Sequence, residues 1–508
     1  MTSSQRIIVN TTAQYTRTII NVCLSLYSTR LILAALGQTD YGIYSVVAGV
    51  VAMLSFVTNA LVTTTQRYLS YNHGKGDLDI VYHIFGNSVL LHLLIAIGLF
   101  VVLGAIYHPI IYSFLHIEPE RLNAAIWVYF ATIVMLCLSF TTAPFRALFI
   151  ARENIVYISI IDVIDGILRL IIAIFLTHVT HWDKLITYAG LLVGISLFNM
   201  LAFAIYALLR FEECHIPRIH EWDKEHIKNL SSFAGWTIYS TGCIIGRTQG
   251  VAVLINRFFG SAMNAAYGIA LQVNGATYFL SQAILNAMNP QITKAEGAGN
   301  RPRMINLAET ASKYAYLLLS MIAIPLIAEM PSVLSFWLGD VPEGSVMFCR
   351  FALIASMIDQ LTIGLGIANQ AIGQIRNYSL TVNSIKILTL PAVWICLHLG
   401  LPIETVMYCF VGFETACMII RLPFLKITAG ISIRHFAKEV FVPLLIPTIT
   451  IVVVCYAMIH YCDFKYRFVV TIITSVIAYL VAIGIFGLSS DEKRILHNII
   501  DNKILHKK

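Results

Sequence analysis

Apolar stretches about as long as a membrane span follow one another along almost the whole chain. An α-helix crosses the hydrocarbon core of a bilayer in about 20 residues, so each stretch predicts one membrane-spanning helix. We therefore expect an all-α polytopic membrane protein with about fourteen spans. Their approximate limits are 14–36, 41–65, 82–107, 122–145, 155–179, 185–209, 230–257, 264–289, 306–329, 345–370, 378–399, 403–423, 440–461 and 467–488.

Two of these spans carry a stripe of small and polar residues. Steps of three and four residues place each stripe along one face of its helix. The first stripe comprises Ser45, Gly49, Ala52, Phe56, Asn59, Thr63 and Gln66, and the second comprises Gly268, Gln272, Gly275, Phe279, Gln282, Asn286 and Asn289. Polar faces inside two like, otherwise apolar halves predict a transporter with a central cavity.

The segments that hold the stripes, 37–77 and 260–300, align with a constant offset of 223 residues. The matched glycine pairs are Gly37 and Gly260, Gly74 and Gly297, and Gly76 and Gly299. Each half contains six of the expected spans, so both halves have the same orientation in the membrane. We expect a pseudo-two-fold axis along the membrane normal to relate them, with the last two helices appended.

The repeat predicts the order of domains along the chain. We expect an N-terminal lobe at 1–209 and a cytoplasmic linker at 210–229. A C-terminal lobe at 230–430 is followed by the appended helix pair at 431–488 and a basic cytoplasmic tail at 489–508.

Composition and charge agree with a membrane protein. The chain is 58% hydrophobic and 12% charged, whereas a soluble domain is about 25% charged. Most lysines and arginines lie in loops on one side, which predicts cytoplasmic termini and explains the net charge of +7 without a nucleic-acid partner. The ten cysteines form no CxxC pair, so neither a metal site nor a disulfide framework is expected. We also expect no cleavable signal peptide.

Several basic side chains lie within the spans, where ionisable groups are costly and often functional. Arg17 shares a helix face with Gln14 and Asn21, which favours a cavity lining, although an interfacial position also explains it. Arg247 lies in the middle of its span and needs an anionic partner from the protein or from a ligand.

The sequence gives weaker support for a cavity role of three further basic residues. Arg30 and Arg257 lie nearer the outer ends of their spans, where anchoring at the interface is the alternative to a cavity role. Lys386 and Asp359 lie at similar depth in one helical hairpin, which predicts an ion pair between them. A substrate or coupling role for Lys386 stays open.

Acidic residues within the spans are candidates for ion coupling. Asp165 and Arg169 can pair along one helix, which leaves Asp162 unmatched on that helix. Asp162 is therefore a candidate proton or sodium site, with a structural ion-pair network as the alternative. Glu414 is an isolated acid in its span, without an assigned role.

The sequence lacks the motifs of soluble enzymes and of ATP-driven pumps. It contains no GxGxxG after a strand, no GxxxxGK[ST] and no HExxH. We expect neither catalysis nor a cofactor, and transport driven by an ion gradient, by the substrate gradient or by a separate subunit.

Three motifs resemble bacterial polysaccharide-export flippases of the Wzx type, within the superfamily that includes MATE exporters and lipid II flippases. They are TRLILAALGQTDYGIYSVVAGVVAML, then QRYLSYNHGKGD, and PFRALFIAREN at 144–154. The resemblance implies a flippase of the bacterial inner membrane that moves undecaprenyl-diphosphate-linked oligosaccharide by alternating access. Polysaccharide polymerase and glycosyltransferases are then candidate partners. A MATE-like drug exporter coupled to H+ or Na+ is the alternative, and a membrane glycosyltransferase is disfavoured by the short outer loops.

The flippase interpretation assigns roles to the polar residues of the spans. Cations suit the diphosphate, and amides suit sugar hydroxyls or the interface between lobes. The expected cations are Arg17 and Arg247 first, followed by Arg30, Arg257 and Lys386. The expected polar lining is Gln14, Asn21, Asn59, Gln66, Gln272, Gln282, Asn286 and Asn289. The candidates for coupling are Asp162, Asp165, Arg169, Asp359 and Glu414. The isoprenoid tail would stay in lipid, along a groove that involves the appended helix pair.

Overall fold

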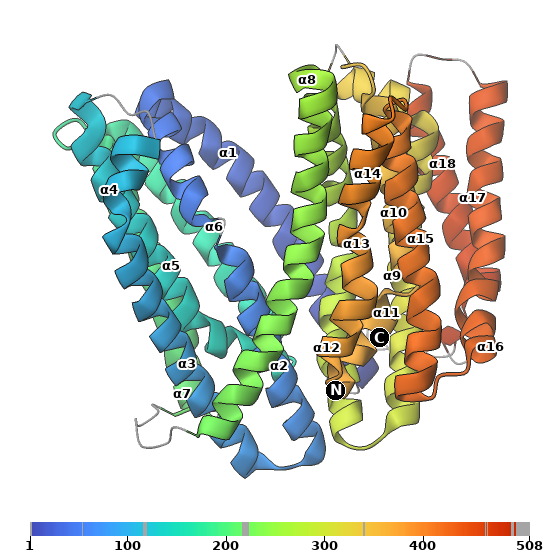
Figure 1. Ribbon diagram of the computed structural model, residues 1–508, viewed down its shortest axis with the longest axis horizontal. Helices are drawn as coiled ribbons and strands as arrows, with labels where there is room; N and C mark the ends of the chain where they lie inside the picture. Colours follow the sequence, from blue (N-terminus) through green and yellow to red (C-terminus); the bar gives the residue numbers. More distant parts are fainter. Residues whose placement is uncertain are drawn as a thin grey trace, which may run out of the picture. The chain divides into compact units, whose positions relative to one another are not determined.

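The computed structural model describes residues 3–52, 54–114, 119–215, 223–338, 341–462, 464, 466–488 and 492–493. Every regular element within these residues is helical (Figure 1). The expected all-α fold class is therefore confirmed.

The N-terminal elements are α1 (Ser3–Ala52), α2 (Ser55–Lys75), α3 (Leu78–Ala105), α4 (Tyr107–Pro109), η1 (Ile110–Phe114), η2 (Pro119–Arg121), α5 (Leu122–Ala151), α6 (Ile155–His178) and α7 (Lys184–Arg210). The later elements are α8 (Lys224–Gly297), α9 (Arg301–Leu338), α10 (Ser345–Gln360), α11 (Ile363–Ile372), α12 (Ile375–Tyr378), η4 (Ser379–Asn383), α13 (Ser384–Ile387), α14 (Thr389–His398), α15 (Glu404–Ala429), α16 (Ile433–Phe436), η5 (Ala437–Phe441), α17 (Val442–Tyr461), α18 (Arg467–Ala482) and η6 (Ile483–Gly487).

Among the described residues, ten helices are long and apolar enough to cross a membrane, and the bent pair α10–α11 adds an eleventh. Of the other three expected spans, 155–179 corresponds to α6, 264–289 lies within α8, and 41–65 is divided between α1 and α2. The segments 41–65 and 264–289 carry the two stripes, and α6 carries Asp162, Asp165 and Arg169. The chain is a multi-pass membrane protein.

Two glycines of the repeat bend long helices at matched points. Gly37 has φ 78° and ψ 173° within α1, and Gly260 has φ 85° and ψ −179° within α8. Glycine adopts positive φ without steric cost, because it has no Cβ. The matched bends confirm that the repeat seen in the sequence is a repeat of backbone structure.

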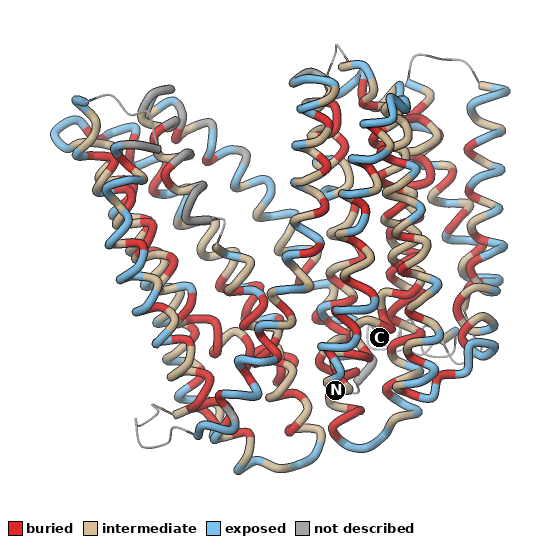
Figure 2. The backbone as a smooth tube through the Cα atoms, in the orientation of Figure 1, coloured by how far each residue is buried: buried red, intermediate tan, exposed pale blue. Residues whose placement is uncertain are grey.

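The chain forms two compact units, each with its own core (Figure 2). Unit 1 comprises 1–241 and 289–300, and unit 2 comprises 242–288 and 301–508. In unit 1, α1 packs on α6, and α5 packs on α2, α3 and α7. In unit 2, α9 packs on α10, α11, α17 and α18. The lobe boundaries drawn from the sequence stay predictions.

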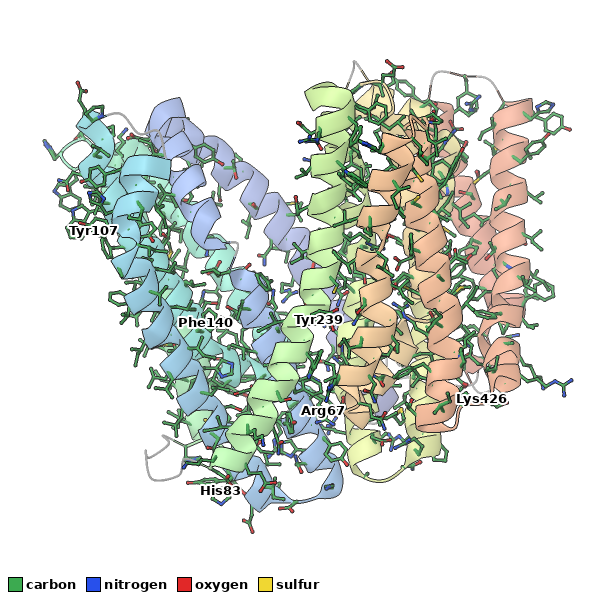
Figure 3. The ribbon with its side chains drawn as sticks, viewed as in Figure 1. Arg67, His83, Tyr107, Phe140, Tyr239 and Lys426 are labelled. Carbon is green, nitrogen blue, oxygen red and sulfur yellow. The ribbon has the colours of Figure 1, made fainter. Side chains whose placement is uncertain are left out.

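The core of unit 1 is built from apolar faces of α3, α5 and their neighbours. Phe140 and Tyr129 are fully buried in it. Figure 3 shows Tyr107 and His83 near opposite ends of this unit, with Phe140 between them. The buried residues that α5 contributes to this core run from Ala124 to Phe140, so the core extends along much of that helix.

Within unit 1, the end of α2 crosses the last turns of α8. The contacts between the two helices are related by an approximate two-fold symmetry. A Cβ on Gly74 would overlap the carbonyl oxygen of Lys294, and a Cβ on Gly297 would overlap that of Tyr71. Positions 71 and 294 differ by 223, as do positions 74 and 297. The two contacts are thus reciprocal, as in an isologous interface, and both need glycine.

In unit 2, α17 and α18 form a pair that polar contacts attach to α9. Arg467 donates to the buried carboxylate of Glu329 over 2.9 Å, at a break in α9. The hydroxyls of Ser320 and Tyr479 lie 2.6 Å apart, about halfway along the same helix. The expected appended pair is therefore held at more than one depth.

Candidate functional site

An open polar pocket lies in unit 1 between α1, α5 and α6. Its volume is about 560 Å³. The lining residues are Arg17, Thr18, Asn21, Val22, Ser25, Arg146 and Asp162. Two guanidinium groups and a single carboxylate give the lining a formal charge of +1.

Asp162 lies between the two arginines of this pocket. Arg17 Nη1 donates to Asp162 Oδ2 over 2.5 Å. Arg146 donates from both terminal nitrogens, over 2.9 Å to Oδ1 and 3.1 Å to Oδ2. The side chains are 24%, 35% and 21% exposed for Arg17, Arg146 and Asp162. All three charges are therefore accessible to a ligand that enters the pocket.

Close packing of α1 on α6 brings these charges together. A Cβ on Gly166 would lie 2.7 Å from Asn21 Oδ1, so the glycine leaves room for the Asn21 side chain at this contact. Asn21 Nδ2 donates to the carbonyl oxygen of Asp162 over 3.2 Å. Asn21 Oδ1 has no hydrogen-bond partner among the described residues. It is a free acceptor beside the pocket.

The structure brings Asp162 together with Arg17 and Asn21, which the sequence had placed on one face of a different helix. Asp162 is unmatched only on its own helix, since two other helices supply its partners. Arg146 was missed because the expected span ended at 145 and left this residue in a turn. In the structure α5 continues to Ala151, which places Arg146 on the helix, 5.3 Å from the ring of Phe203.

The other expected lining residues near this site differ in exposure. Gln14 is buried. The side chain of Arg30 lies outside the described residues. Asn59 is exposed, and Gln66 is buried and lies 3.4 Å from Asn289.

Asp165 belongs to a separate cluster on α6. Arg169 and Asn199 of α7 each donate a hydrogen bond to the Asp165 carboxylate over 2.6 Å. The pairing of Asp165 with Arg169 expected from their spacing is present. Asp165 does not line the pocket.

Unit 2 contains an alternating chain of five charges, which we call the ion chain: Arg247, Glu414, Lys386, Asp359 and Arg421. Arg247 donates to Glu414 over 2.5 Å, and Lys386 donates to Glu414 over 2.6 Å. Lys386 also donates to Asp359 over 3.1 Å, and Arg421 donates to Asp359 over 2.7 Å.

The ion chain lies where helices are irregular. Asp359 precedes the break between α10 and α11, and Lys386 follows the π-helical segment η4. Irregular turns in membrane helices often occur at functional sites. The side chains of Arg247, Lys386, Glu414 and Arg421 are buried, in contrast to the open pocket of unit 1.

The ion chain changes the interpretation of two residues. Glu414 is not isolated, because Arg247 and Lys386 both contact it. The anionic partner that Arg247 needs is supplied by the protein. The expected pair of Asp359 and Lys386 is present.

The remaining polar residues of the second stripe lie in unit 2. Gln282 donates to Asn286 over 3.0 Å, and Gln272 is exposed. Arg257 is also exposed. Their cavity roles stay predictions.

One end of unit 1 is held by the residues of PFRALFIAREN. Glu153 has φ 60°, a strained value for a residue with a Cβ. Its carboxylate accepts from Lys294 over 2.6 Å and from Gln291. Its carbonyl oxygen accepts from Asn10 over 2.9 Å. Glu153 thus ties α1 and the end of α8 to the turn between α5 and α6.

Glu213 reinforces the same end, outside the membrane-spanning segments. It accepts from Arg152 over 2.6 Å and lies 3.2 Å from His73. Burial alone would raise its pKa. Hydrogen bonds from His73 and Arg152 outweigh burial and lower the pKa to about 2.

Comparisons with known proteins bear on the fold. No protein-family model matches the chain, and no curated protein matches it. A MATE transporter in a bent conformation matches with a TM-score of 0.74 at 11% identity, over 86% of this chain and 97% of the other. A MOP superfamily transporter from Pyrococcus furiosus Vc1 (DSM3638) matches with a TM-score of 0.72 at 12% identity, over 85% and 96%.

The MATE transporter ClbM in complex with Rb+ matches with a TM-score of 0.70 at 16% identity, over 86% of this chain and 96% of the other. These likenesses extend over nearly the full length of the solved chains. The protein therefore has the fold of the MATE and MOP transporters.

Proposed function

We propose that the protein is a membrane transporter that flips diphosphate-linked oligosaccharide lipids from the cytoplasmic to the periplasmic leaflet of the bacterial inner membrane. The observation that carries the proposal is the open pocket of unit 1, in which Arg17 and Arg146 outnumber Asp162. Alternating access exposes this pocket to each side in turn.

The chemistry of the pocket suits a diphosphate that bears sugars. Arginine stays protonated and presents a planar set of donors that matches two phosphate oxygens. Thr18, Asn21 and Ser25 supply hydroxyl and amide groups on the same lining. These groups complement sugar hydroxyls, as the arginines complement phosphate.

The competing function is a MATE-like exporter of cations. The fold agrees with it equally well, and ClbM was solved with Rb+. Such an exporter needs acids that are accessible and are not already paired with a cation of the protein. Among the described residues, each of the four candidate acids contacts an arginine or lysine: they are Asp162, Asp165, Asp359 and Glu414. The Pyrococcus furiosus transporter is described by a reverse polarity of its binding pocket that suggests a different function. In this chain, the net positive lining of the pocket favours an anion.

The proposal also covers the orientation of the transporter in the membrane, the path of the lipid tail and the partner enzymes. Both termini face the cytoplasm, and the isoprenoid tail remains in lipid along α17 and α18. Glycosyltransferases supply the lipid-linked unit, and a polysaccharide polymerase consumes it. Coupling to H+ or Na+ through Asp162, Asp165, Arg169, Asp359 or Glu414 is a separate proposal, which a gradient dependence of transport would test.

Deletion of the gene tests the proposal in cells. We expect lipid-linked oligosaccharide to accumulate in the cytoplasmic leaflet and surface polysaccharide to disappear. Plasmid-borne wild type and Arg210→Ala should restore the polysaccharide, because Arg210 is exposed at the end of α7. Arg17→Ala should not. Unchanged polysaccharide together with new sensitivity to cationic dyes would instead support the exporter.

A further inference from the structure

A single carboxylate contacts both arginines of the pocket. Asp162 uses Oδ2 for Arg17 and both oxygens for Arg146. Two carboxylate oxygens bridging two guanidinium groups resemble the way in which a phosphate group would bind them. The pocket therefore already contains an anion, supplied by α6.

The position of Asp162 differs from that of the other paired acids. Glu414 is buried in the ion chain, so its cations are closed to a ligand. Asp165 pairs with Arg169 away from the pocket lining. Among the described acids of the spans, Asp162 alone lines a described pocket together with its cations.

We propose that Asp162 is an internal counter-anion that binds Arg17 and Arg146 at the phosphate site and is displaced by the incoming anion. This inference rests on the proposed function and concerns regulation of the same site. An anion enters only if its attraction to Arg17 and Arg146 exceeds that of the carboxylate. Diphosphates carry more charge and more acceptor oxygens than monovalent anions, so they compete better.

Displacement also gives Asp162 a role in release. A carboxylate held on α6 stays beside the arginines after the ligand has entered. It competes for the same donors when the site opens to the other side, which speeds dissociation of the ligand. Removal of the charge should therefore strengthen binding and slow transport at once.

Asp162→Asn separates this role from a structural one, because it keeps the size and removes the charge. The full-length protein in nanodiscs of zwitterionic lipid is titrated with inorganic pyrophosphate and with orthophosphate. We expect affinity for both to rise about tenfold, since both displace the same carboxylate. Asp165→Asn, one turn away on α6, is the matched control and should leave both affinities unchanged. Turnover of lipid-linked oligosaccharide by Asp162→Asn in proteoliposomes should fall.

The outcomes distinguish this inference from the proposed function. Equal or weaker pyrophosphate binding by Asp162→Asn, with wild-type binding that Arg17→Ala abolishes, overturns the counter-anion and leaves the phosphate site standing. Absence of pyrophosphate binding in both the wild type and Asp162→Asn overturns both. Should Asp162→Asn fail to fold, Asp162→Ser removes the same charge with a smaller side chain. Tighter binding by Asp162→Ser supports the inference, and unchanged binding refutes it.

Discussion

Glu414 is the residue on which the ion chain of unit 2 depends most. Its carboxylate accepts from Arg247 over 2.5 Å and from Lys386 over 2.6 Å. Arg247 contacts no other carboxylate among the described residues. Glu414→Gln therefore leaves a buried arginine without its anion, which costs about 3–5 kcal/mol of unfolding free energy.

Arg247→Gln should cost less, and this asymmetry is the prediction. The variant leaves Lys386 and Arg421 facing Glu414 and Asp359, so the four remaining charges balance and each keeps a partner. The expected loss is about 1.5–3 kcal/mol, as for one hydrogen bond to a charged group.

Thermal unfolding followed with a thiol-reactive dye measures the difference. Cys417 is buried one turn from Glu414 on α15 and reacts only when this region opens. The unfolding temperature of Glu414→Gln should lie clearly below that of Arg247→Gln, with Arg257→Gln as an exposed control. Equal unfolding temperatures for the two ion-chain variants, or a lower one for Arg247→Gln, would refute the argument that loss of Glu414 leaves a buried charge unpaired whereas loss of Arg247 does not.

Three further predictions concern unit 1. Gly297→Ala should prevent the crossing of α2 and α8 and lower the yield of folded protein. Gly98→Ala is the control and should be tolerated, because nothing lies within 4 Å of its Cβ position. Size-exclusion profiles of the two variants measure the difference. The lowered pKa of Glu213 contributes stability above its unfolded value of 4.5, and this contribution is lost as pH falls toward about 2. Unfolding temperatures across that range should therefore depend less on pH in Glu213→Gln than in the wild type; parallel curves would contradict the assignment. Glu153→Gln removes the charge that holds 289–300 and should speed hydrogen exchange in that segment, and unchanged exchange would show that other contacts hold it.

Local patterns in the sequence predicted the fold well. Span length and periodicity gave the all-α class, because both follow from helix geometry and membrane thickness. The repeat predicted Gly37 and Gly260 as equivalent, and both bend their helices at positive φ. Asp359 and Lys386 were predictable as a pair, because they lie on adjacent helices of one hairpin.

Contacts between helices that lie far apart in the sequence could not be predicted from the sequence. Periodicity shows which residues share a face, but not which helix lies against that face. Glu414 and Arg247 are 167 residues apart, so their pairing appears only in the folded chain. Arg146 was missed for a different reason, since helix boundaries inferred from hydropathy are uncertain by several residues.

Flipping by purified protein in proteoliposomes tests the central claim most directly. The substrate is a polyprenyl-diphosphate-linked oligosaccharide whose accessibility on the outer leaflet is followed with time. We predict protein-dependent flipping that falls about tenfold or more in Arg17→Ala and in Arg146→Ala and is retained in Arg210→Ala. Equal flipping by all four proteins, or no flipping together with transport of cationic dyes, would contradict the account.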